Sequence, residues 1–198
     1  MKLDYFNPLD FIAALVWLVI ILIIAYNRAA KNKHLPYYKY YLPNVYFKLL
    51  FGIVFASFYV FYYEGGDTAA YWNGAKALNN LFFKSPAEYF DEIFTAHENI
   101  SITNHFDFAT SYPPGWIYRE KEGWFVSKLA SLLSFICFKS YWAATFITSF
   151  VLANASWKLF ELIRGYKLHK ELHIALAVLF IPSVAFWCGG VSKDTVVL

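Results

Sequence analysis

The sequence predicts an all-α membrane protein with about four transmembrane helices and a long outer loop that contains juxtamembrane, interfacial helices. Its 198 residues are 59% hydrophobic and 22% aromatic, with a mean hydropathy of +0.41, which is too apolar for a soluble chain of this size. Long apolar runs alternate with polar segments, and the basic and acidic residues gather in different segments. We therefore treat residues 1–198 as a single transmembrane domain.

The first predicted span covers about residues 9–26, which approaches the roughly 20 apolar residues that cross a membrane. Basic residues without any acidic one follow it, so the positive-inside rule places residues 27–44 in the cytoplasm and the N-terminus outside. The second span covers about residues 45–63. Lys48 lies near its cytoplasmic end, where its amine is expected to extend toward the lipid headgroups.

Residues 64–139 carry nine carboxylates against six lysine and arginine residues, a charge balance typical of an outer loop. Helix signals recur in this loop. Asp67 is placed to cap a helix that runs to Asn79, and Ser85-Pro86-Ala87-Glu88 fits a capping box with proline at the first helical position. Because aromatic and charged residues mix in these helices, we expect them to lie in the membrane interface.

The apolar run Trp124–Phe138 decides the topology of the rest of the chain. At about 15 residues it is short for a span. If it crossed the membrane, the next basic cluster would lie outside, so we interpret the run as interfacial and residues 164–171 as cytoplasmic. The remaining spans then cover about residues 141–163 and 172–188, the last one kinked or broken at Pro182.

Two polar corners on the predicted outer face are candidate functional sites. The first is the turn Glu64-Gly65-Gly66-Asp67. Aspartate is favoured as a helix cap, but a carboxylate at this surface can also act as general base, or hold a divalent cation (Mg²⁺ or Mn²⁺) that neutralises a phosphate. Glu64 is either a second carboxylate or an interfacial anchor, and we rank it below Asp67.

The second corner is the segment Gly189–Asp194. Ser192-Lys193-Asp194 is a typical helix start. Lys193 at this depth can also bind a phosphate as a point charge, while Asp194 either orients Lys193 or shares a metal with Asp67.

The other polar residues and the cysteines give no specific prediction of a functional site. The spacing of His97, Glu98, His105 and Asp107 matches no metal motif, so we interpret them as a solvated loop. Cys137 and Cys188 are interpreted as small apolar residues, with a disulfide left open. We expect no nucleic-acid partner, because the basic residues are grouped as topology signals.

The order of these features resembles the GT-C superfamily of polytopic glycosyltransferases, the lipid-carrier-dependent group that includes protein mannosyltransferases and aminoarabinose transferases. The matching features run from Val45 to the end of the chain: Glu64-Gly65-Gly66-Asp67 followed by Tyr71-Trp72, then Tyr112-Pro113-Pro114-Gly115, Phe138–Ala144 and Pro182–Asp194. The first span is extra relative to the family, and two glycines separate the acidic pair. The family has more spans than four, so we expect residues 1–198 to be the N-terminal part of a longer protein and inactive alone.

The resemblance implies an inverting transferase that moves a sugar from a polyprenyl-phosphate donor, within the membrane lipid, to an acceptor on the outer face. Asp67 and Glu64 would be catalytic, and Lys193, Asp194, Tyr71 and Trp72 would bind the substrate. Two alternatives stay open: a polysaccharide polymerase or ligase, and a non-catalytic scaffold or transporter subunit. If there is a site, Asp67 and Asp194 should share a cavity.

Overall fold

The computed structural model describes residues 8–95, 102, 104–166 and 170–197, and within these ranges the protein is helical and contains no strand. Among the described residues, three helices are long and apolar enough to cross a membrane. They are α1 (Pro8–Lys31), the continuous helix Pro36–Tyr62, and α7 (Tyr141–Gly165). The second consists of η1 (Pro36–Tyr40), α2 (Tyr41–Ser57) and a π-helical end, η2 (Phe58–Tyr62).

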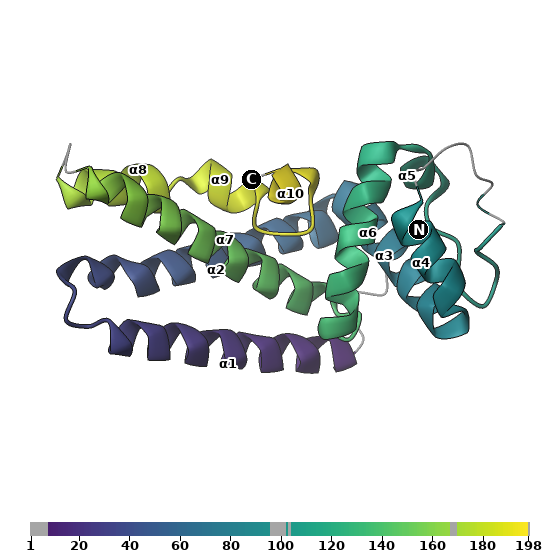
Figure 1. Ribbon diagram of the computed structural model, residues 1–198, viewed down its shortest axis with the longest axis horizontal. Helices are drawn as coiled ribbons and strands as arrows, with labels where there is room; N and C mark the ends of the chain where they lie inside the picture. Colours follow the sequence, from purple (N-terminus) through teal and green to yellow (C-terminus); the bar gives the residue numbers. More distant parts are fainter. Residues whose placement is uncertain (1–7, 96–101, 103, 167–169, 198) are drawn as a thin grey trace.

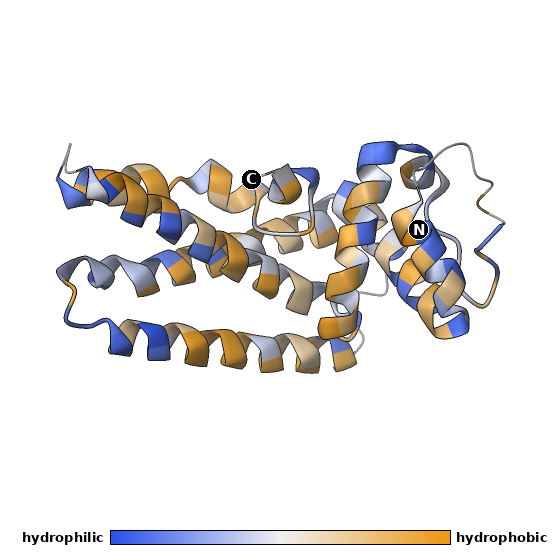
Figure 2. Ribbon diagram, in the orientation of Figure 1, coloured by the Kyte–Doolittle hydropathy of each residue, from blue (hydrophilic) through white to orange (hydrophobic). Residues whose placement is uncertain are grey.

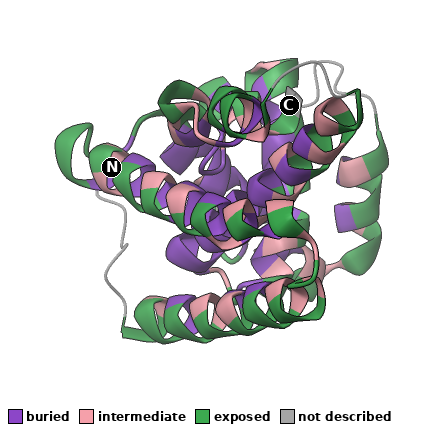
Figure 3. Cartoon of the chain, turned by 90° about the vertical axis from the view of Figure 1, so that its left-hand side faces the viewer, coloured by how far each residue is buried: buried purple, intermediate pink, exposed green. Residues whose placement is uncertain are grey.

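These three helices lie along the long axis of the molecule and form a bundle with α8 (Glu171–Leu179) and α9 (Pro182–Trp187) (Figure 1). Apolar residues run along most of α1, and hydrophilic residues occupy its last turn (Figure 2). Its outward side chains are exposed, for example Leu15 at 61% and Ile23 at 55%, whereas buried residues face the interior of the bundle (Figure 3). An exposed apolar surface of this kind is stable in hydrocarbon, so the fold supports the predicted class of membrane protein.

The fourth predicted span differs from the other three. Residues 171–187 form an apolar helix pair that is shorter than the three long helices. Proline at the first position of α9 cannot continue the preceding hydrogen-bond ladder, and the helix breaks between Leu179 and Pro182. The predicted break at Pro182 is confirmed.

Polar contacts tie the bundle together inside. Asn154 of α7 accepts hydrogen bonds from Arg28 of α1 at 2.5 Å and from Tyr41 of α2 at 3.2 Å. The amide of Asn44 donates to the backbone carbonyl of Ala153 at 2.8 Å. In hydrocarbon such contacts stabilise helix pairs modestly, and they specify which helix faces meet.

The sequence predicted that the amine of Lys48 extends toward the headgroups, but in the structure it does not. It is 0% exposed, and its Nζ has no hydrogen-bond partner among the described residues. The helix begins at Pro36 instead of near residue 45, so Lys48 lies about three turns inside it. The predicted position was wrong because the start of the helix was placed too late.

The segment between the second and third long helices forms an end subdomain of four helices: α3 (Gly66–Lys84), α4 (Pro86–Phe94), α5 (Gly115–Arg119) and α6 (Lys121–Ile136). It lies at one end of the bundle, and α6 runs across the direction of the long helices (Figure 1). Ser85 caps α4 as predicted, its Oγ accepting from the N–H of Glu88 at 3.4 Å. At 16 residues α6 is too short for a span, which agrees with an interfacial position for Trp124–Phe138.

A buried carboxylate joins three parts of the end subdomain. Glu92 of α4 has a side chain only 2% exposed, and it accepts a hydrogen bond from the indole N–H of Trp124 at 2.8 Å. His105 Nδ1 lies 2.9 Å from its other oxygen. Burial and the charge of Glu92 raise the pKa of Tyr118, which keeps that phenol protonated at neutral pH. The subdomain therefore has its own polar core.

Candidate functional site

The acidic turn after the second long helix has an unusual backbone. Glu64, Gly65 and Gly66 all have positive φ angles, of 48°, 146° and 69°. Glycine adopts such angles freely, but a glutamate there is uncommon. The N–H of Gly65 donates to the carbonyl of Tyr59 at 3.0 Å, and a Cβ on Gly66 would lie 3.0 Å from the Tyr59 ring. The diglycine thus packs the turn tightly against η2.

Asp67 follows this turn in the first turn of α3. The helix begins at Gly66 with Gly65 as its N-cap, and no side chain makes a capping hydrogen bond. The prediction that Asp67 caps the helix is therefore wrong, because the positive-φ diglycine starts the helix two residues earlier, at Gly66 instead of Thr68. The carboxylate is exposed and still benefits from the positive end of the helix dipole. Asp67 therefore faces solvent and makes no capping contact with the helix.

Lys193 lies at the centre of the second corner. Its Nζ forms a short ion pair with Glu120, the residue before α6. The side chains are 40% and 39% exposed, respectively, so the pair stays within reach of solvent. The hydrogen bond to Glu120 raises the pKa of Lys193 and keeps it protonated.

Tyr71 belongs to the same cluster. Burial raises the pKa of its phenol, while the neighbouring ammonium of Lys193 opposes that shift. A Cβ on Gly123 would lie 2.9 Å from Glu120 Oε2 and 3.3 Å from the Tyr71 ring. Glycine in the first turn of α6 therefore allows Tyr71 and Glu120 to converge on Lys193.

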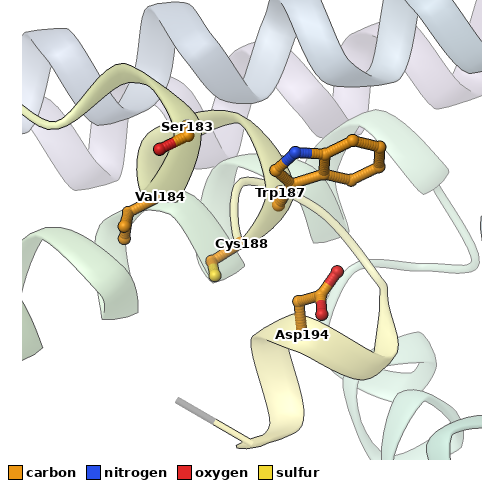
Figure 4. A pocket seen from close by; sticks show the side chains of 5 residues that line it. All are labelled: Ser183, Val184, Trp187, Cys188 and Asp194. Atoms are coloured by element: carbon orange, nitrogen blue, oxygen red, sulfur yellow. The ribbon is translucent and has the colours of Figure 1, made fainter.

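Asp194 lines a pocket of about 470 Å³ together with Ser183, Val184, Trp187 and Cys188. The carboxylate lies across from the end of α9, on the side of Trp187 and Cys188 (Figure 4). The pocket is mostly apolar, and Asp194 is the only one of these lining residues with a carboxylate. Here α10 (Lys193–Val197) begins as predicted, with Ser192 Oγ accepting from the N–H of Thr195 at 3.1 Å.

Gly189 and Gly190 hold this corner against α2. A Cβ on Gly189 would lie 2.9 Å from the Cα of Gly52, and the carbonyl of Gly189 accepts from Ser149 Oγ at 2.8 Å. A Cβ on Gly190 would lie 2.4 Å from the ring of Phe55. The two glycines allow loop and helix to approach at backbone distance, and so determine where Lys193 and Asp194 lie.

Gly190→Ala is expected to destabilise the protein by about 1–3 kcal/mol, the usual cost of an overpacked core. Phe55 is 1% exposed and packs against Tyr59 and Phe186, so its ring has no space into which to move. Thermal unfolding in detergent micelles measures the effect. Gly115→Ala is the matched control, since a Cβ there meets nothing within 4 Å. Equal melting temperatures for both variants would contradict the close packing.

The two predicted corners share two tyrosine neighbours, and one of them is Tyr71, whose phenol lies near both Asp67 and Lys193. The charges of Asp67 and Asp194 both act on the phenol of Tyr59 in η2. Asp67 is nevertheless not among the residues that line the Asp194 pocket. The structure therefore brings the corners within electrostatic range of the same two tyrosines, without placing both carboxylates in that pocket.

A divalent cation does not fit this arrangement. Among the described residues, no group of three or more His, Cys, Asp or Glu side chains is placed to hold a metal ion. Asp67 and Asp194 would supply two carboxylates at most, and Glu120 is already paired with Lys193. We derive no step through a metal.

The remaining predicted site residues lie elsewhere. Glu64 is exposed, with no hydrogen bond or ion pair to a described residue. Trp72 is 1% exposed and packs edge-on against Tyr141, with ring centroids 6.2 Å apart, so its position is that of a core residue. Cys137 and Cys188 are both buried and free.

His105 and Asp107, which the sequence placed in a solvated loop, contact different parts of the end subdomain. His105 contacts Glu92 and, at 3.5 Å, Asp91. Asp107 pairs with Lys84 at 2.9 Å, and hydrogen bonds from Lys84 and the backbone of Thr110 lower the pKa of Asp107 to about 2. His97 and Glu98 lie outside the described residues.

Sequence reasoning missed Glu120 and Tyr59. Glu120 was counted only as one of the loop carboxylates, and no local pattern links it to Lys193, which is 73 residues away. Its position directly before a helix was a weak signal. Tyr59 was one aromatic residue among many in an apolar run.

Comparison of the chain with protein-family models, with curated proteins and with solved structures gave no match. The class of this protein therefore follows from its own fold. In the part of the chain that the structure describes, it is an α-helical protein with three helices that fit a membrane, and a polar cluster where α3, α6 and α10 meet.

Proposed function

We propose that the whole protein transfers a sugar from a polyprenyl-phosphate donor to an acceptor hydroxyl at the membrane surface. The observation that carries this proposal is the convergence of Lys193, Glu120 and Tyr71. Lys193 directly precedes Asp194 in the chain, and Asp194 lines the pocket described above. A protonated amine beside carboxylates suits a reaction in which a phosphate leaves and a hydroxyl loses its proton.

The proposed step is an inverting displacement. The acceptor oxygen bonds to the anomeric carbon while the bond from that carbon to the phosphate oxygen breaks, and its electron pair stays on the phosphate. Asp67 takes the proton of the acceptor hydroxyl, because its carboxylate is exposed and makes no capping hydrogen bond. Lys193 stabilises the charge that develops on the leaving phosphate.

An apolar groove supports a lipid-linked donor. It has a volume of about 370 Å³ and lies between α6 and α7, lined by residues that include Leu132, Ile136 and Val151. Cys188 and Thr195 also line it, so it reaches the corner that contains Lys193 and Asp194. In the proposal the polyprenyl chain occupies this groove and its phosphate lies at Lys193.

The finer topology is part of the same proposal. The pair α8–α9 forms a fourth, broken span, residues 64–139 lie outside, and residues 27–44 and 164–171 lie in the cytoplasm. This arrangement places the end subdomain and α10 on one side of the membrane, as a shared site requires.

The test is donor use by the whole protein in proteoliposomes. A panel of polyprenyl-phosphate-linked hexoses and the corresponding nucleotide-linked hexoses is supplied, and the free polyprenyl phosphate or nucleotide that is released is measured. We expect release from at least one polyprenyl donor and none from the nucleotide donors. Release from nucleotide sugars alone, or from no donor while the protein is folded and inserted, would overturn the proposal.

A further inference from the structure

A third pocket lies where the end of α1 meets η1 and the start of α2. These ends of the helices lie at the opposite end of the bundle from the end subdomain (Figure 1). Its volume is about 490 Å³. The residues on which the argument rests are Tyr26, Lys33, Leu35, Tyr38, Lys39 and Leu42. None of them belongs to the proposed transfer site.

The pocket lies at the level where the hydrocarbon of a membrane would end. It joins the last residues of one long apolar helix to the first residues of the next. Tyr26 and Tyr46 are both exposed, and their hydroxyls share a hydrogen bond of 2.7 Å. Tyrosines are enriched at the membrane–water interface because one end of the side chain is apolar and the other polar.

The charge around the pocket is positive. Lys33 and Lys39 line it and are exposed, and the sequence has no aspartate or glutamate between residues 27 and 48. Neither lysine forms an ion pair with a described residue. The acids on the neighbouring helices are already paired, Glu161 with Lys158 at 3.4 Å and Glu171 with Arg164 at 3.3 Å.

We propose that this pocket binds the headgroup of an anionic phospholipid. The two ammonium groups contact the phosphate, while Tyr26, Leu35 and Leu42 contact the glycerol and the start of the acyl chains. Basic pockets between membrane helices bind anionic lipid in this way, and each lysine near the surface contributes to the attraction. A free phosphate would leave the apolar wall of the pocket without a partner, which favours the lipid.

The experiment measures lipid binding to the purified whole protein by native mass spectrometry. Dioleoyl-phosphatidylglycerol and dioleoyl-phosphatidylcholine are added in parallel, and inorganic phosphate is added in a competition arm. We expect the protein to retain phosphatidylglycerol selectively. The double variant Lys33→Gln and Lys39→Gln should retain it about tenfold less, since two favourable charges are lost.

Two matched variants complete the test. Lys158→Gln, which removes an exposed lysine of α7, should bind like the wild type. Arginine at both pocket positions should keep most of the binding. Equal retention of the two lipids, unchanged retention by the glutamine double variant, or full competition by inorganic phosphate would each overturn the proposal. An unchanged melting temperature of the glutamine variant without lipid excludes unfolding as the cause.

Discussion

Asp67→Asn in the whole protein is expected to lower sugar transfer by about 10²- to 10⁴-fold, the usual contribution of a general base. The amide keeps the size of the side chain but cannot accept a proton from the acceptor hydroxyl. Because Asp67 is exposed and makes no capping hydrogen bond, the change should leave folding and membrane insertion intact. The measurement is the release of polyprenyl phosphate per unit of inserted protein.

The control for this variant is Asp91→Asn. Asp91 is an aspartate of α4 with a side chain 61% exposed, and it contacts His105, away from the Lys193 cluster. It should keep wild-type activity. If Asp67→Asn retains transfer at the wild-type rate, Asp67 is not the base. The donor assay with the wild-type protein would still stand, so this failure is distinct from failure of the proposed function.

Lys193→Gln is expected to lower transfer by about 10²- to 10³-fold, the usual effect of removing one group that stabilises charge in the transition state. Lys193→Arg should restore part of the activity, because the charge is kept while its shape changes. The single-turnover rate of donor cleavage in proteoliposomes checks both variants.

Glu120→Gln separates a role of Lys193 in catalysis from a purely structural one. Lys193 stays present in that variant, so transfer at neutral pH should fall much less than in Lys193→Gln. If both variants lose equal activity and equal thermal stability, the ion pair has a structural role only, holding α10 against the start of α6.

The same variant predicts a pH effect. The hydrogen bond to Glu120 raises the pKa of Lys193 above its ordinary value of 10.5, so the ammonium form, and any activity that needs it, persists as the pH rises. Glu120→Gln removes the negative charge and leaves only a weaker, neutral hydrogen-bond acceptor, so the alkaline decline in rate should move to lower pH. A pH profile identical to that of the wild type would contradict the assignment.

The sequence predicted the elements whose cause is local. Long apolar runs predicted the three long helices, because only a continuous helix satisfies its own backbone in hydrocarbon. Ser85, Pro182 and Ser192 marked helix starts correctly, because capping and the proline ring act within one turn. The errors at Asp67 and Lys48 were errors of boundary, where the diglycine and Pro36 shifted the helix start.

The candidate site depended on contacts that no local pattern contains. Lys193 and Asp194 were predicted as a polar corner, but Glu120, the partner of Lys193, is 73 residues distant in the chain. Trp72 follows Tyr71 directly, yet the helix turns its ring into the core while Tyr71 reaches Lys193. Neighbouring residues of a helix point in different directions, so only packing decides which of them faces a site.

By itself the sequence determined that this is an apolar, helical chain with its charges sorted into segments, because hydropathy and charge act residue by residue. Tertiary structure decided that Gly52, Gly189 and Gly190 let loop and helix approach at backbone distance. It also decided that Lys193 pairs with Glu120 and lies beside Tyr71. These are contacts between segments far apart in the chain, and they exist only once the helices have packed.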